Sequence, residues 1–283
     1  MADIYLGILL IYAFSAALLL TGFKLARTSP HWVTIGLMLV TLTLLLYSST
    51  RGRDRLQLAQ ALPVSNLVVI GDMLPAEGAL LLGLSWPLIA GGARRKAVVI
   101  VPLLLAMTYQ ANWPLFAKGP MVGDKWREGV CRQTSAVTCV PAAAATLLQY
   151  YGIAATESEM ADLCLTTPRG TSMLGLFRGL KIKTEGTPWE VMPFVGTRED
   201  LRKLGVGPVI LSVGIDPTSK ADRQYQQENG WIPGVNHTVV LYGFLADGKI
   251  DIGDPAVGRE TWSANDLDLL WRGEGIYLAR SAE

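Results

Sequence analysis

Long uncharged apolar stretches in the first part of the chain constrain its folding more than any other feature. The first, IYLGILLIYAFSAALLLTGF, runs over 20 residues from Ile4 to Phe23 without a charge. At roughly 1.5 Å per residue, a helix of this length crosses about 30 Å of hydrocarbon. Residues 32–49 and 97–116 have the same character. We therefore expect membrane-spanning helices at 4–23, 32–49 and 97–116.

A further apolar stretch at residues 67–90 allows two interpretations, because it carries Asp72 and Glu77 near its start. In one, residues 74–90 form a single span and residues 67–70 lie at the membrane interface. In the other, the segment is broken or re-entrant, which membranes tolerate only where protein surrounds the backbone. Intramembrane carboxylates are frequently functional. We favour a position for both at the membrane edge, and a function of their own remains an alternative hypothesis.

Charge and hydropathy divide the chain near Lys118. Residues 1–118 contain nine Lys and Arg and four Asp and Glu, whereas residues 119–283 contain sixteen and twenty. We expect a transmembrane region of about four helices at 1–118 and a globular domain at 119–283. The chain lacks a phosphate loop, a dinucleotide glycine motif, HExxH, CxxC and a basic block. These absences predict no nucleotide, no cofactor, no metal and no nucleic acid as ligand.

The C-terminal domain changes from helical to extended patterns along its length. Four residues have the type and position of helix N-caps: Thr138, Thr156, Thr197 and Ser263. Short apolar runs predict strands at 208–215, 237–245, 249–254 and 275–280, and Asp247-Gly248 is typical of the tight turn of a hairpin. Helices followed by an antiparallel sheet predict an α+β domain.

Four side chains of this domain have the types and order of thiol-protease chemistry. Cys139 begins a predicted helix, whose N-terminus favours the thiolate. His237 begins a strand, and Asp254 ends the returning strand 17 residues later, so the hairpin brings base and orienting carboxylate together. Gln133, six residues before Cys139, offers an amide N–H₂ to a tetrahedral oxyanion, as does the backbone N–H of Cys139.

The segment QTSAVTCVPAAAATLLQYYG, Gln133 to Gly152, resembles the Q-x₅-C-G-P-A-A opening of the bacteriocin-processing, papain-like cysteine peptidases. These are leader-peptidase domains often fused to ABC exporters. EMADLCLTTPRGTSMLGL, NHTVVLYGF and DIGDPAVGRETWSANDLDLLWRGEGIYL are similar to the later helix, the His strand and the Asp-Pro hairpin of that family. The resemblance implies a papain-like α+β fold with Cys139 as nucleophile, His237 as base, Asp254 as orienting residue and Gln133 as oxyanion donor.

Two departures limit what the resemblance implies. Val140 stands where the family usually has Gly, and the chain has no ATPase motif, so neither export nor specificity for double-glycine leaders carries over. Our main hypothesis is a membrane-anchored cysteine peptidase that acts on a membrane-proximal or exported protein or peptide. The alternatives are a peptide-binding or regulatory module of the same fold that does not cut, and other acyl transfer of the amidase or transglutaminase kind.

The remaining cysteines, Cys131 and Cys164, allow two hypotheses. They are either unpaired, half-buried thiols or a disulfide that braces the segment bearing Gln133. On the chain-entropy model such a loop closure stabilises by roughly 3–4 kcal/mol. Because a disulfide requires an oxidising compartment and the charges flanking the spans are almost balanced, the disulfide hypothesis places the peptidase domain on the extracytoplasmic face.

Overall fold

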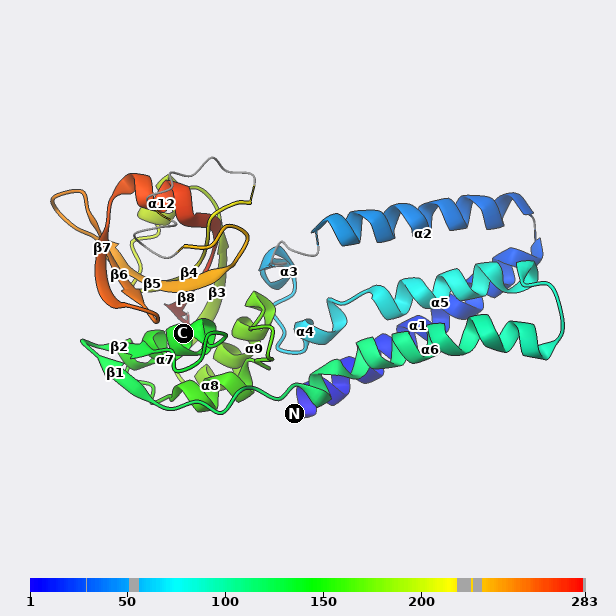
Figure 1. The fold of residues 1–283 in the computed structure, drawn as a ribbon, viewed down its shortest axis with the longest axis horizontal. Helices are drawn as coiled ribbons and strands as arrows, with labels where there is room; N and C mark the ends of the chain where they lie inside the picture. The colour runs from blue at the N-terminus through cyan, green and yellow to red at the C-terminus, as the bar shows by residue number, and fades with distance from the viewer. Residues whose placement is uncertain (29, 51–55, 218–224, 226–230, 282–283) are drawn as a thin grey trace. The chain divides into compact units, whose positions relative to one another are not determined.

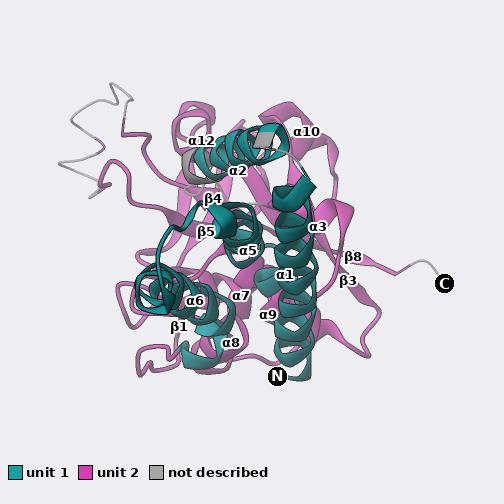
Figure 2. Ribbon diagram, turned by 90° about the vertical axis from the view of Figure 1, so that its right-hand side faces the viewer, with its two compact units in different colours: residues 1–54, 66–117 teal, residues 55–65, 118–283 magenta. Residues whose placement is uncertain are grey.

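The computed structural model describes the whole chain except residues 29, 51–55, 218–224, 226–230 and 282–283 (Figure 1). It divides into two compact units, residues 1–54 with 66–117 and residues 55–65 with 118–283 (Figure 2). The first unit is helical. Every strand of the described residues belongs to the second unit.

The first unit consists of apolar helices. They are α1 (Ala2–Thr28), α2 (Pro30–Thr50), α4 (Leu67–Ile70), α5 (Leu74–Ser85) with a 3₁₀ turn at Trp86–Leu88, and α6 (Ala93–Phe116). Within the described residues, three segments have the length and composition to cross a membrane: Ala2–Thr28, Leu67–Leu88 and Ala93–Phe116. The apolar part of α2, His31–Leu46, is shorter. The expected N-terminal region of several apolar helices is confirmed.

Residues 71–73 separate two helices in the stretch at residues 67–90, which agrees both with a span that begins at Leu74 and with a broken segment. α4 ends before Gly71, and α5 starts at Leu74. A new helix start leaves N–H groups without helical partners. One oxygen of Asp72 accepts the N–H of Leu74 at 3.2 Å, and the other accepts the side-chain amide of Gln110. The Asp72 carboxylate therefore has a structural role at this break.

Helices α1 and α5 touch through their backbones at two glycines. A Cβ atom placed on Gly83 would lie 2.4 Å from the carbonyl oxygen of Leu19, and one on Gly22 would lie 2.9 Å from that of Leu80. Both distances are shorter than side chains allow, so only glycine fits. Small residues that permit close backbone approach are typical of helix contacts in membranes.

The second unit begins with helices and a two-stranded sheet. In chain order these are α3 (Leu56–Ala61), β1 (Lys125–Arg127), β2 (Val130–Arg132), α7 (Cys139–Tyr150), α8 (Glu157–Leu163), α9 (Met173–Thr184) and α10 (Arg198–Lys203). Thr156 accepts the N–H of Glu159 as expected, but the Glu159 carboxylate pairs with Lys183 at 2.5 Å and completes no capping box. Thr138 precedes α7 without a side-chain cap and instead bonds to Ser135.

A six-stranded antiparallel sheet forms the centre of this unit. Its strands are β3 (Trp189–Val195), β4 (Val209–Val213), β5 (His237–Phe244), β6 (Ile250–Asp254), β7 (Gly258–Trp262) and β8 (Trp271–Arg280), in the order β3-β8-β4-β5-β6-β7. Helices α7 to α9 lie on one side and α12 (Ala264–Leu270) on the other (Figure 1). The predicted α+β architecture, helical part first and antiparallel sheet second, is confirmed.

Candidate active site

Cys139 is the first residue of α7, the most deeply buried helix of the second unit. The four alanines from Ala142 to Ala145 are completely buried, and the helix contacts β4 and β5. Small side chains let the helix approach the sheet closely, which fixes the position of its first turn. Cys139 itself is half-buried, whereas Val140 points into the core with 5% of its surface exposed. The backbone at Val140 is helical, so the fold does not require glycine there.

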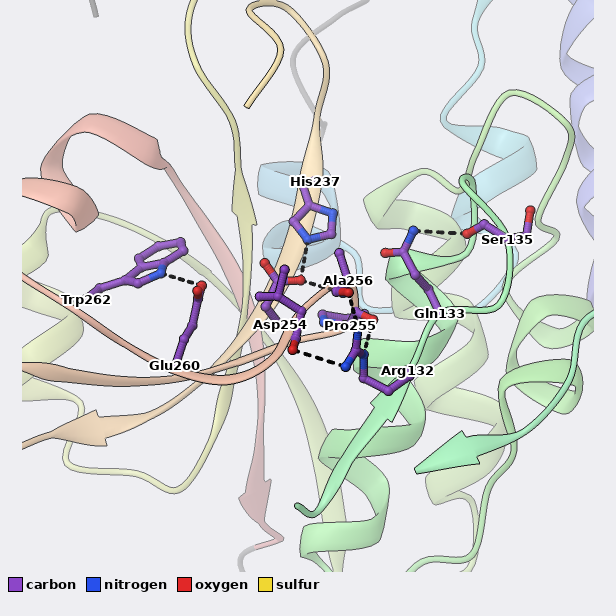
Figure 3. Close-up of polar contacts among 10 residues, drawn as sticks. Arg132, Gln133, Ser135, His237, Asp254, Pro255, Ala256, Glu260 and Trp262 are labelled. Carbon is purple, nitrogen blue, oxygen red and sulfur yellow. Dashed lines mark hydrogen bonds and ion pairs between the residues drawn. The ribbon is translucent and has the colours of Figure 1, made fainter. Parts of the chain in front are cut away.

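The β5–β6 hairpin brings His237 and Asp254 together, as predicted. Val240 pairs with Gly253 and Leu241 with Ile252, so Asp254 lies opposite Val239 and on the same sheet face as His237. His237 Nε2 is 2.8 Å from Asp254 Oδ1 (Figure 3). The same carboxylate oxygen accepts the N–H of Ala256 at 2.6 Å, which fixes its orientation. Because Nε2 faces Asp254, the other ring nitrogen, Nδ1, is left for the thiol.

The electrostatics of His237 link it to both partners. Burial of the imidazole disfavours its charged form and so lowers its pKa. Hydrogen bonds and charge attraction from Asp254 and Cys139 outweigh burial and raise the pKa from its ordinary 6.5 to about 10. Cys139 is thus linked to His237 through hydrogen bonding and charge. The site favours an imidazolium at neutral pH.

Gln133 follows β2 and is held at both backbone and side chain. Its N–H donates to the carbonyl of Pro255 at 2.9 Å, and its Nε2 donates to the carbonyl of Ser135 at 3.0 Å (Figure 3). The bond to Ser135 uses one of the two N–H groups of the amide and fixes which end of the side chain carries the nitrogen. The second N–H keeps the capacity to donate to an oxyanion. Oε1 is buried and has no hydrogen-bond partner among the described residues.

Arg132 joins the two halves of the site, a role that sequence reasoning missed. Its guanidinium donates to the carbonyls of Pro255 and Val257 at 3.1 Å each and also to that of Ala256 (Figure 3). These carbonyls belong to the turn directly after Asp254. One fork-shaped side chain thus ties the segment before Cys139 to the segment that orients His237. No spacing in the sequence indicates this contact, because 123 or more residues separate the partners.

Glu260 and Trp231 complete the surroundings of His237 and were also missed. Burial raises the pKa of Glu260 from its usual range, the hydrogen bond from Trp262 Nε1 lowers it, and the charge of Asp254 raises it further. The Trp231 ring meets the His237 ring edge-on, with 5.7 Å between centroids. The surroundings of His237 thus include the aromatic ring of Trp231 and, besides Asp254, the carboxylate of Glu260. Among the described residues, no group of three or more His, Cys, Asp or Glu could hold a metal ion.

The disulfide hypothesis is wrong for this structure, because Cys131, Cys139 and Cys164 are all free thiols. Cys131 lies beside α7, where its N–H donates to Thr146 Oγ1 at 2.9 Å. Cys164 lies against α9, and a Cβ on Gly179 would come within 2.3 Å of its sulfur. Each thiol fills its own buried site. Burial raises the pKa of both to about 12, and the argument for an extracytoplasmic location loses its basis.

A helix-borne thiol within reach of a sheet-borne imidazole and carboxylate, in an α+β domain, is the arrangement of the cysteine peptidases. Residues 127–187, which include Gln133 and Cys139, match the model of the Peptidase C39 family. The sequence resemblance to the bacteriocin-processing cysteine peptidases is thus confirmed over these residues.

The chain is also similar to two proteins described as uncharacterized. It is 39% identical over 174 residues to one from Methanothermobacter thermautotrophicus and 45% identical over 172 residues to one from Methanothermobacter marburgensis. Each match covers 60% of this chain and 99% of the relative.

Two solved structures are similar at lower identity. A double glycine motif protease from an AMS/PCAT transporter, in complex with its leader peptide, is 22% identical with a TM-score of 0.43, covering 58% of this chain and 94% of that one. The peptidase domain of Streptococcus ComA, a bi-functional ABC transporter, is 23% identical with a TM-score of 0.42, covering 53% and 96%.

Proposed function

We propose that this chain is a membrane-anchored cysteine peptidase that hydrolyses peptide bonds with Cys139 as nucleophile. The observation that carries the proposal is the position of His237, which interacts with Asp254 through Nε2 and with the thiol of Cys139. Asp254 is 4% exposed and acts as an orienting group because it also holds the N–H of Ala256. The match of residues 127–187 to a cysteine peptidase family supports the same chemistry.

In the first half of the reaction, the Cys139 thiolate attacks the carbonyl carbon of the scissile peptide bond. A new S–C bond forms, and the carbonyl electrons move onto oxygen. The backbone N–H of Cys139 and the second N–H of the Gln133 amide are the donors for this oxyanion. His237, protonated on the nitrogen that faces the sulfur, gives its proton to the departing amine as the C–N bond breaks. The product is a thioester on Cys139.

In the second half, water attacks the thioester. Neutral His237 takes a proton from the water as the new C–O bond forms, and the tetrahedral oxyanion again needs the Gln133 and Cys139 donors. The S–C bond then breaks, the carboxylic acid product leaves, and the thiolate–imidazolium pair is restored. Asp254 keeps the imidazole in the required orientation throughout.

The test compares the wild-type chain with Cys139→Ala and His237→Ala in detergent, using a library of natural peptides and mass spectrometry of new termini. We expect cleavage by the wild type and none by either variant, while Cys164→Ala, a matched loss of a buried thiol, still cleaves. If a thiol-directed peptide electrophile does not label Cys139 of the wild type, or if His237→Ala leaves the labelling unaffected, the chain is a peptide-binding module and the proposal fails.

The first unit supports membrane anchoring. Ala2–Thr28 and Ala93–Phe116 combine helical lengths of 27 and 24 residues with high hydropathy, and only 28% and 11% of their apolar windows are buried inside the fold. Apolar side chains that remain uncovered by protein require lipid. A peptidase held at a bilayer meets membrane-proximal or exported proteins and peptides as substrates. Resistance of the full chain to extraction from membranes by alkaline carbonate tests the anchoring, and release into the supernatant would refute it.

A further inference from the structure

We propose that Glu157 is a positioning residue for the oxyanion donor, acting through Thr134 on the adjacent Gln133. This inference rests on the proposed peptidase function. It adds a residue that contacts neither the thiol nor the imidazole in the structure. Its role is to hold the backbone of the loop between β2 and α7, which carries Gln133.

Glu157 makes two hydrogen bonds to one residue. Oε1 accepts the backbone N–H of Thr134 at 2.8 Å, and Oε2 accepts the Thr134 hydroxyl at 2.8 Å. Glu157 is completely buried. A buried carboxylate costs free energy unless it is fully hydrogen-bonded. Both of its oxygens accept hydrogen bonds from Thr134, so the free energy that offsets burial of the carboxylate depends on the position of Thr134.

Thr134 transmits this restraint to Gln133 because the two share a peptide bond. On the other side of that bond, the Gln133 N–H donates to the carbonyl of Pro255 at 2.9 Å. The Thr134 hydroxyl oxygen also accepts the N–H of Gly123 at 2.8 Å. The Gln133 backbone is therefore fixed from two directions, by the turn after Asp254 and by Glu157 at the start of α8.

Positioning of this kind matters for the chemistry of an oxyanion donor. Loss of one such donor reduces turnover by roughly 10²–10³-fold in a serine protease, and displacement by about 1 Å can cost on the order of 10²-fold. When the thiolate displaces the halide of an alkyl halide, no oxyanion forms. The two kinds of reaction at Cys139 therefore separate a displaced donor from a damaged nucleophile.

The experiment measures two rates at Cys139 of the full chain in detergent. With p-nitrophenyl acetate, the thiolate forms an S–C bond through a tetrahedral oxyanion, and p-nitrophenolate leaves as the C–O bond breaks. With iodoacetamide, the thiolate displaces iodide directly. We expect Glu157→Ala to slow acylation by about tenfold or more and to change alkylation less than about twofold. Glu159→Ala, on the same helix but in a partly exposed ion pair with Lys183, is the matched control and should leave both rates unchanged.

Combination with Gln133→Ala tests whether the two residues act together. If Glu157 acts through Gln133, Glu157→Ala causes no further loss of acylation when Gln133 is already replaced by alanine. Additive losses, equal losses of acylation and alkylation, or wild-type acylation in Glu157→Ala would each overturn the inference. A wild-type chain that reacts no faster than Cys139→Ala with either probe would instead refute the proposed function.

A second pair of variants keeps the test valid if Glu157→Ala does not fold. Thr134→Ser retains the hydroxyl and both bonds to Glu157, whereas Thr134→Val retains the size and loses the hydroxyl bonds. We expect wild-type acylation from Thr134→Ser and selective loss of acylation from Thr134→Val. Equal acylation rates in these two variants would contradict the inference, because the Thr134 hydroxyl would then play no part.

Discussion

At the scale of single residues, the site depends on an imidazole that is largely buried and yet charged. Burial alone would make His237 neutral, and the opposing effects of Asp254 and Cys139 are stronger. The raised pKa keeps His237 protonated across the neutral range. Its protonation stabilises the fold fully below pH 6.5, and this contribution is lost as the pH rises toward 10.

Asp254→Asn should lower the pKa of His237, because it removes a negative charge that favours the imidazolium. The chain has two histidines, so His31→Gln leaves a single imidazole for NMR titration of a histidine-labelled sample. In that background we expect a midpoint near pH 10 when Asp254 is present. The Asp254→Asn substitution should lower this midpoint by about one unit or more. A midpoint near 6.5 with Asp254 present would show that the predicted pairing does not form in solution.

The three thiols should differ in reactivity because only Cys139 is reachable. Cys131 and Cys164 are 0% and 1% exposed, and burial raises the pKa of each to about 12. We expect iodoacetamide to add one label to the native chain and three labels to the unfolded chain without reductant, counted by intact mass spectrometry. A single label on the unfolded, unreduced chain would instead support the hypothesis of a disulfide between Cys131 and Cys164.

Residue types and order in the sequence were sufficient to bring Cys139, His237 and Asp254 into one hypothesis, because a helix start and a hairpin are local structures. The partners of these residues were not predictable. Arg132 and Glu157 act on segments that are close only after folding, and neither lies in a local motif. Glu159 pairs with Lys183 near the surface, whereas Glu157, two residues earlier, is the carboxylate that the fold buries.

At the scale of elements, strand prediction succeeded where the hydrophobic pattern was clear and failed at the two edges of the sheet. β4 is completely buried and apolar except for Ser212, and β5 and β6 are joined by Asp247-Gly248. β3 contains Pro193, which removes a backbone donor, and edge strands are where a sheet tolerates that loss. β7 buries mainly its ends, so its sequence GRETW has no apolar run.

Gly83→Val should destabilise the first unit, because a side chain at Gly83 meets the backbone of α1 and cannot move aside. We expect a loss of about 2 kcal/mol or more, seen as a lower midpoint of thermal unfolding in detergent. Gly92→Ala is the control, since a Cβ at Gly92 has no atom within 4 Å. Equal midpoints for Gly83→Val and the wild type would show that α1 and α5 do not touch at this glycine.

At the scale of the whole molecule, two separate segments of the chain form the second unit. Residues 55–65 belong to that unit although they lie between two apolar segments of the first. α3 contacts β3 and α9, and Gln60 Nε2 donates to the carbonyl of Pro193 at 3.3 Å. The sequence-based boundary near Lys118 did not assign α3 to the second unit, because its sequence LQLAQA is too short to show a helical period of apolar residues. Separating the domain at residue 118 would remove a helix from its fold.

Leu56→Ala should therefore weaken the peptidase unit and not the apolar helices among which Leu56 lies in sequence. Leu56 is completely buried, and its truncation costs about 2–5 kcal/mol. Leu58→Ala, on the same helix but 40% exposed, is the matched control. In hydrogen exchange of the full chain, we expect Leu56→Ala to reduce amide protection in β3 and β8 and to leave α1 and α5 unchanged, while Leu58→Ala changes neither. Reduced protection confined to α1 and α5 would assign α3 to the first unit instead, and the peptidase domain would then be separable at residue 118 without loss.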